Sequence, residues 1–181
     1  NEANDTDDAS QTTSLRYKAI LEAVSTSGFT DPSFIKVQGS SQNKALRWIS
    51  DFDPFQMHED SDAILQRYAL ATLFFATNEG IEPHDRDFRS EWIQDDNWLS
   101  GKGICLWYGV ECPLRVHEGT MTSQYNENAD VVKLFLPKNN IQGTIPLDLA
   151  ALESLTSIDF SSNQIEEAFP PFLIGFEFLG T

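Results

Sequence analysis

The side chains of this sequence that could do chemistry are its carboxylates, its three histidines and its two cysteines. With 28 acidic residues, some pair of carboxylates could lie at the distance that general acid–base catalysis needs. Abundance carries no information about geometry, however, and the sequence has no glycine-rich phosphate loop, GxSxG elbow or HExxH motif. We therefore expect no catalytic residue, no cofactor and no enzymatic activity.

One acidic cluster could bind a cation. Its members are Asp51, Asp53, Glu59, Asp60 and Asp62. The cluster lacks both the ligand order and the glycine of an EF-hand loop, which favours a solvated loop with a helix N-cap. The three histidines are scattered along the chain and suggest no metal site. We expect no bound metal, with weak calcium binding as the alternative.

The two cysteines, Cys105 and Cys112, admit three interpretations: free thiols, half of a metal site, or a disulfide. The metal interpretation needs about four ligands, and the sequence offers no cluster that would complete the set. The spacing of the two residues alone does not decide between the remaining interpretations.

The charge of the chain narrows the range of partners. The net charge is −16, and a surface this negative repels phosphate, so nucleic acid and anionic membranes are poor partners. No apolar run approaches the ~20 residues that span a bilayer, so we expect no direct membrane insertion of this segment.

Hydrophobic spacing predicts three helices behind a flexible, acidic arm over 1–14. The arm contains Asn4 in an Asn-Asp-Thr triplet, the acceptor pattern for glycosylation. Apolar residues at i, i+3, i+4 and i+7 predict amphipathic helices around 17–24 and 45–52. A longer apolar stretch predicts a central helix from a cap at Ser61 to the glycine at residue 80.

After an irregular stretch that ends at residue 130, the chain repeats itself. Segments 131–154 and 155–178 align at a constant offset of 24, with apolar residues at the same places and one asparagine each, Asn139 and Asn163. Alternating apolar residues near the start of each segment predict a short strand. The asparagine then turns the chain inward, where its amide can bond the backbone of the neighbouring segment.

Two motifs carry a resemblance to a known family. The run Asn-x-Ile-x-Gly-Thr-Ile-Pro begins at Asn139, and Trp98-Leu99-Ser100 precedes the stretch from Cys105 to Cys112. Together they resemble the repeat and the N-terminal cap motif of plant-type leucine-rich-repeat proteins. Upstream, KALRWISDFDP and LQRYALATLFFATNEG resemble the extended helical cap of stramenopile-algal members.

The resemblance implies an α/β fold with a helical N-terminal cap over 15–130, followed by a short leucine-rich-repeat solenoid. The solenoid would hold two 24-residue coils with short parallel strands, 131–154 and 155–178, and the start of a further coil. It also implies a disulfide between Cys105 and Cys112, and therefore a secreted, extracellular or lumenal location.

Two details qualify this resemblance. The second segment has Glu167 where the first has Gly143, so we expect an irregular second coil. Several aromatic residues of the cap region could stack on sugar rings, but their place in the cap motif favours core packing. These residues are Trp92, Trp98, Trp107 and Tyr108.

The resemblance implies a protein-interaction or recognition module of a secreted or membrane-anchored protein, with a protein, peptide or glycan ligand. Solenoids bind through the outward positions of their strands, so we expect ligand contacts at four residues. These are Lys133, Phe135, Ser157 and Asp159. The alternative is a structural subunit that docks on neighbouring subunits through an apolar C-terminal end. The residues of that end are Phe169, Phe172, Ile174, Phe176 and Phe178.

Overall fold

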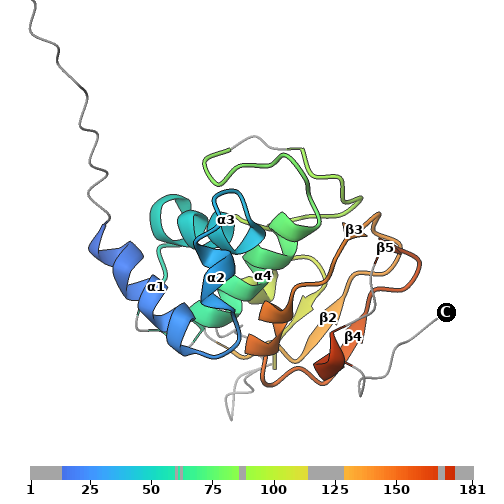
Figure 1. Cartoon of the computed structure of the whole chain (residues 1–181). Coiled ribbons are helices and arrows are strands. Elements are labelled where there is room, and N and C mark those ends of the chain that lie inside the picture. The colour runs from blue at the N-terminus through green and yellow to red at the C-terminus, as the bar shows by residue number, and fades with distance from the viewer. Residues whose placement is uncertain are drawn as a thin grey trace, which may run out of the picture.

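The computed structural model describes residues 14–59, 61, 63–85, 89–113, 129–166 and 170–173. Within these ranges a layer of helices packs against a smaller layer of short strands (Figure 1). The predictions for the arm over 1–13, including Asn4, lie outside the described residues. The expected mixture of helices with a small sheet is present.

Helix α1 (Leu15–Thr26) forms where the amphipathic spacing predicts it. Ser14 belongs to the cap of this helix, because its side-chain oxygen accepts a hydrogen bond from the Tyr17 amide at 3.0 Å. Ile20 and Val24 are fully buried against the rest of the helical layer. The first predicted helix is therefore confirmed, together with its inward face.

The second predicted helix changes its winding part-way. It begins as α3 (Ser41–Arg47) and continues as a π-helical turn, η1 (Trp48–Phe52). The amide of Asp53 donates to the Trp48 carbonyl at 2.8 Å, five residues back, where an α-helix would bond four residues back. The wider turn leads directly to Asp53, whose side chain is fully buried.

The third predicted helix is α4 (Ile64–Ala76), and it starts three residues after the expected cap. Ser61 still contributes, through a carbonyl that accepts from the Ile64 amide at 2.9 Å. Nearly all side chains of α4 are buried, which confirms its central position. A short helix, α2 (Pro32–Ile35), was not expected, because four residues are too few to show a period.

The strand layer joins segments that are distant in sequence. Strand β2 (Lys133–Phe135) pairs with β4 (Ser157–Asp159) in parallel, and β1 (Val110–Glu111) pairs with β2 antiparallel. A second small sheet pairs β3 (Gln142–Gly143) with β5 (Gln164–Ile165) in parallel. The described residues also form 3-10 helices, which are η2 (Ile104–Leu106), η3 (Leu147–Ala151) and η4 (Pro171–Leu173).

The constant offset of 24 holds for only one of the two parallel pairs. Lys133 lies opposite Ser157, 24 residues on, whereas Gln142 lies opposite Gln164, 22 residues on. The register therefore shifts after the asparagine turn. Glu167, at which we expected an irregularity, lies outside the described residues.

One hydrophobic core serves both layers. Buried residues from α1, α3, α4 and the strands form a single cluster, and η3 packs directly against α4. Leu134 and Leu136 are fully buried on the inward side of β2, as the alternation predicts. The irregular sequence before residue 130 and the repeated sequence after it therefore share one hydrophobic core.

Candidate functional site

The outward side of the three-stranded sheet β1–β2–β4 carries the predicted contact residues. We call this surface the sheet face and define it by Glu111, Lys133, Phe135, Ser157 and Asp159. Register places Lys133 between Glu111 and Ser157, in one row across the three strands. Phe135 and Asp159 lie opposite each other in the next row that carries outward side chains. The structure therefore brings all four predicted contact residues together.

Charge and ring contacts orient the side chains of the first row. Lys133 Nζ lies 3.3 Å from a carboxylate oxygen of Glu111, and 5.8 Å from the centroid of the Phe135 ring. Both charged side chains are about half exposed, so this ion pair adds little stability. It leaves a half-exposed cation, a carboxylate and an aromatic ring next to one another, a combination suited to polar contact with a ligand.

Asp159 has a different position from the other members of the sheet face. It is only 9% exposed, and its carboxylate accepts a hydrogen bond from the Ser161 amide at 2.8 Å. The carboxylate therefore shapes the turn that follows β4. Glu111 was missed in the sequence, because its place beside Lys133 depends on an antiparallel pairing across more than twenty residues. The only available signal was its position next to Cys112.

Two asparagines connect the repeated segments, as expected. The Asn163 side chain accepts from the backbone amides of Asn139 and Ile141, at 2.9 and 3.0 Å, and donates to the Leu136 carbonyl at 2.7 Å. The Asn139 side chain makes the equivalent bonds to Gln94, accepting from its amide at 2.7 Å and donating to its carbonyl at 2.9 Å. The irregular loop before the repeat thus takes the place of a preceding segment.

The expected disulfide between Cys105 and Cys112 is present, with Cα atoms 5.5 Å apart. It closes the loop that leads into β1, next to Gly109. Gly109 has φ +77°, and a Cβ atom there would lie 2.3 Å from the Phe135 carbonyl oxygen. Only glycine permits the loop to approach β2 this closely, so the disulfide and the glycine together hold β1 on the sheet.

The aromatic residues of the cap region pack in the core. Trp92, Trp98 and Trp107 are at most 5% exposed, and their rings contact one another at 4.7 to 5.0 Å between centroids. This confirms the packing interpretation for the three tryptophans. Tyr108 is partly buried, and its carbonyl accepts from the Trp98 indole at 2.9 Å.

A fully buried ion pair lies beside these rings. Arg67 of α4 donates two hydrogen bonds to the Asp53 carboxylate, at 2.8 and 2.6 Å, and both side chains are 0% exposed. Two further N–H groups of its guanidinium donate to the carbonyls of Ser100 and Lys102. The guanidinium also lies 4.9 Å from the ring centroid of Trp107. Its hydrogen bonds and charge are satisfied within the core, which indicates a structural role.

A second buried carboxylate lies where the two layers meet. Asp148 of η3 is 2% exposed and accepts hydrogen bonds from the Thr30 hydroxyl and from Gln42 Nε2, the latter at 2.8 Å. Burial raises the pKa of Asp148 above its ordinary value. The buried Tyr68 hydroxyl is near this carboxylate, and burial followed by the Asp148 charge raises the pKa of Tyr68.

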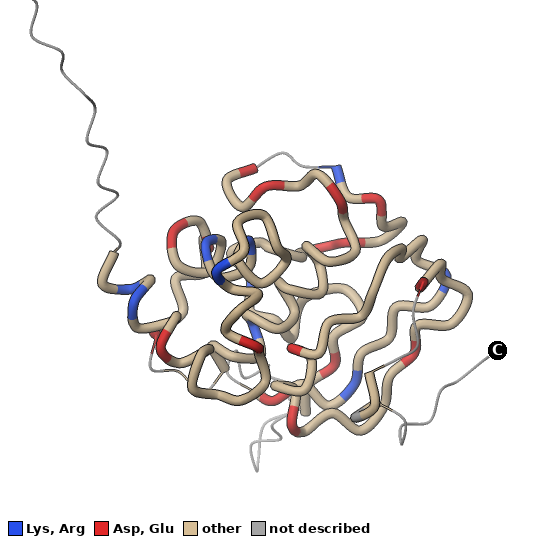
Figure 2. The backbone as a smooth tube through the Cα atoms, in the orientation of Figure 1, with Lys and Arg blue, Asp and Glu red and all other residues tan. Residues whose placement is uncertain are grey.

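Among the residues that the structure describes, no three His, Cys, Asp or Glu side chains are grouped as metal ligands. Within the acidic cluster, Asp53 is paired with Arg67, and Glu59 lies 3.2 Å from Arg16. Asp60 and Asp62 lie outside the described residues. Acidic positions occur in both layers of the molecule (Figure 2).

The apolar C-terminal end lies almost wholly outside the described residues. This applies to Phe169, Ile174, Phe176 and Phe178, and to the side chain of Phe172. Leu173 is buried in the common core. Among the described helices, none has both the length and the apolar character that a membrane crossing requires.

No protein-family model matches this chain, and neither the curated proteins nor the solved structures contain a significant match.

Proposed function

We propose that this chain is the capped beginning of a plant-type leucine-rich-repeat protein. It acts as a non-catalytic recognition module that binds a protein, peptide or glycan through the sheet face. The protein is secreted or lumenal, or is the ectodomain of a membrane-anchored protein. A disulfide together with an acidic surface fits such an oxidising, aqueous location.

One observation carries the proposal: the way in which the two repeated segments stack. Strands 24 residues apart pair in parallel, and the Asn163 side chain bonds backbone groups of the preceding segment. In stacking of this kind, a side chain of one repeat satisfies backbone groups of the repeat before it, so that neighbouring repeats hold each other in place. It leaves the outward positions of β2 and β4 to form one surface.

A photo-crosslinking experiment tests the sheet face as the contact surface. A benzophenone amino acid replaces Ser157 on the sheet face or, as a control, the exposed Glu22 on α1. Both proteins are returned to the cells from which the sequence comes and irradiated. We expect a discrete crosslinked partner at Ser157 and none at Glu22. Equal crosslinking at the two positions would count against recognition through this face.

The intact mass of the natural protein separates recognition from the alternative of a structural assembly subunit. The present sequence accounts for 20.4 kDa. A much larger natural mass favours a longer solenoid with receptor-like recognition. A mass close to that of this sequence favours the assembly subunit. In either case reduction adds two hydrogens if the disulfide forms in the natural protein.

A further inference from the structure

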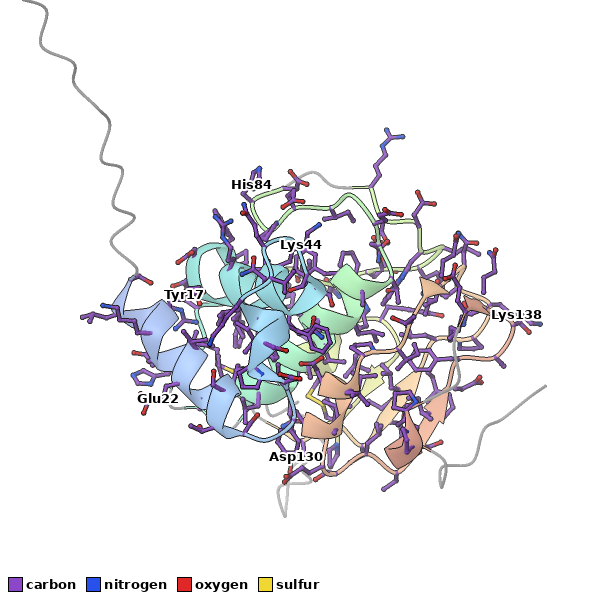
Figure 3. All side chains as sticks on the ribbon, in the orientation of Figure 1. Tyr17, Glu22, Lys44, His84, Asp130 and Lys138 are labelled. Carbon is purple, nitrogen blue, oxygen red and sulfur yellow. A yellow bond between two sulfur atoms is a disulfide. The ribbon has the colours of Figure 1, made fainter. Side chains whose placement is uncertain are left out.

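A cleft of about 590 Å³ lies on the helical layer, away from the sheet face. We call it the Phe52 cleft and define it by Asp51, Phe52, Gln56, His84, Asp85 and Leu99. One wall is the π-helical turn η1 with the residues that follow it, and the other is the loop after α4. Figure 3 shows His84 on this loop, at the edge of the molecule and far from Glu22 on α1.

Hydrogen bonds and ion pairs hold both walls of the cleft in place. Lys44 donates to the Ile81 carbonyl at 2.9 Å and lies 2.9 Å from a Glu82 carboxylate oxygen, which fixes the loop that carries His84. Arg67 bonds both Asp53 and the Ser100 carbonyl, which fixes the opposite side. A ligand would therefore find the cleft already formed, and would lose little free energy in ordering it.

An aromatic ring is available in this cleft. The tryptophans beneath it, Trp48 and Trp98, are 4% and 3% exposed and offer almost no surface. Phe52 is 38% exposed, and its ring centroid lies 6.2 Å from that of His84. An exposed ring of this size is suited to stacking with a planar group or to a cation above its face.

The two exposed carboxylates of the cleft, Asp51 and Asp85, are hydrogen-bond acceptors. Gln56 uses its amide nitrogen on the Asp53 carbonyl, at 2.5 Å. Asp51 is exposed, and its side chain makes no hydrogen bond or ion pair with any of the described residues. Asp85 accepts from the Glu82 amide at 2.8 Å with one oxygen, and its other oxygen lies 3.9 Å from His84. A ligand that complements these two carboxylates must donate hydrogen bonds.

We propose that the Phe52 cleft binds an arginine side chain of a protein or peptide partner. The charge of Asp53 is balanced by Arg67, so Asp51 and Asp85 remain to attract a cation. A guanidinium is planar and can stack on Phe52, and its fork of donors matches carboxylate oxygens. The net charge of −16 favours the approach of a basic partner.

The test uses the whole 181-residue protein and N-acetyl-arginine amide as the probe, with binding followed by NMR. N-acetyl-citrulline amide, which has nearly the same shape without the charge, is the matched ligand. We expect the arginine probe to shift the signals of His84 and Phe52 in a saturable manner, and the citrulline probe to bind at least tenfold more weakly. Equal binding of the two ligands, or no saturable binding of arginine, overturns the proposal.

Two variants separate a specific site from general attraction to an acidic protein. Asp51→Asn and Glu22→Gln each remove one exposed negative charge, the first inside the cleft and the second on α1. We expect Asp51→Asn to weaken arginine binding at least fivefold and Glu22→Gln to leave it within twofold. Circular dichroism checks that both variants are folded. Equal losses in the two variants reduce the effect to net charge and refute the site.

Discussion

Asp53 and Asp148 are both buried carboxylates, but the two regions of the core neutralise them differently. Asp53 receives two hydrogen bonds from a cation, Arg67, within the helical layer. Asp148 receives its hydrogen bonds from neutral donors, Thr30 and Gln42, at the junction of the two layers. The first region is a closed ion pair, and the second is a carboxylate without a balancing charge among its hydrogen-bond partners.

The difference predicts which region tolerates the loss of a charge. Removing one member of a buried ion pair leaves the other charged and unsolvated, which is costly. Removing the charge of a carboxylate that has only neutral partners relieves a desolvation penalty instead. Three substitutions test this contrast, in order of decreasing effect.

Arg67→Met has the largest expected effect. It leaves the Asp53 carboxylate buried without its partner and removes the donors to two backbone carbonyls, so we expect a loss of about 3–5 kcal/mol. Urea unfolding followed by tryptophan fluorescence measures the change, because Trp48 and Trp107 flank Arg67. Arg47→Met on α3 is the control, with an expected loss of about 0.5 kcal/mol or less. A loss for Arg67→Met as small as that of the control would contradict the assigned role.

Adding Asp53→Asn to Arg67→Met sharpens the result. Asp53→Asn removes the negative charge that Arg67→Met leaves unpaired. The asparagine keeps a side-chain oxygen for the Phe55 amide, which in the parent protein donates to Asp53 at 2.9 Å. We expect the double variant to be more stable than Arg67→Met by about 2 kcal/mol, because residues in one buried network are not additive. Additive losses in the same unfolding assay would mean that the two side chains act independently.

Asp148→Asn has the smallest expected effect and the opposite sign. Burial raises the pKa of Asp148 above 3.8, so the folded state holds this proton more tightly than the unfolded chain. The stability that this contributes is present at pH below 3.8 and is lost as pH rises through the folded pKa. We therefore expect Asp148→Asn to be more stable than the parent by about 1 kcal/mol near pH 7.

Unfolding midpoints measured across a pH series check whether Asp148→Asn is more stable than the parent, and over which pH range. The gain of Asp148→Asn should shrink as the pH falls towards 3.8, where the parent carboxyl becomes protonated. Asp31→Asn serves as the counterpart, because the Ser33 amide lowers the pKa of exposed Asp31. Its change should have the opposite sign at neutral pH. A loss for Asp148→Asn at every pH would show that the hydrogen bonds to Asp148 require the charged form.

Much of the local structure was predictable because it follows from short-range periodicity. The amphipathic spacing from Tyr17 onward determined α1 and its buried face. Alternation around Leu134 determined the inward side of β2, and Asn163 has the bonding role that its place in the repeat predicted. The sheet-face residues of β2 and β4 could be named for the same reason, since outward positions follow from a period of two.

These short-range patterns do not predict which distant segments of the chain lie next to each other. The antiparallel β1 that adds Glu111 to the sheet face joins residues with no common period. The Phe52 cleft depends on a π-helical turn and on a loop held by Lys44, neither of which leaves a periodic signal. The pairing of β3 with β5 could not be predicted either. These strands pair residues that are 22 positions apart, although the two segments align in sequence at a constant offset of 24.

The sequence by itself thus determined the three longer helical segments, the strands β2 and β4, their inward faces and the repeat, because each of these is encoded over a few neighbouring residues. Only the tertiary structure decided the state of the buried charges. Asp53 meets Arg67 across 14 residues, and Asp148 meets Thr30 across 118. Whether a carboxylate is solvated, paired or protonated depends on what the fold places around it, and desolvation has no local signature in the chain.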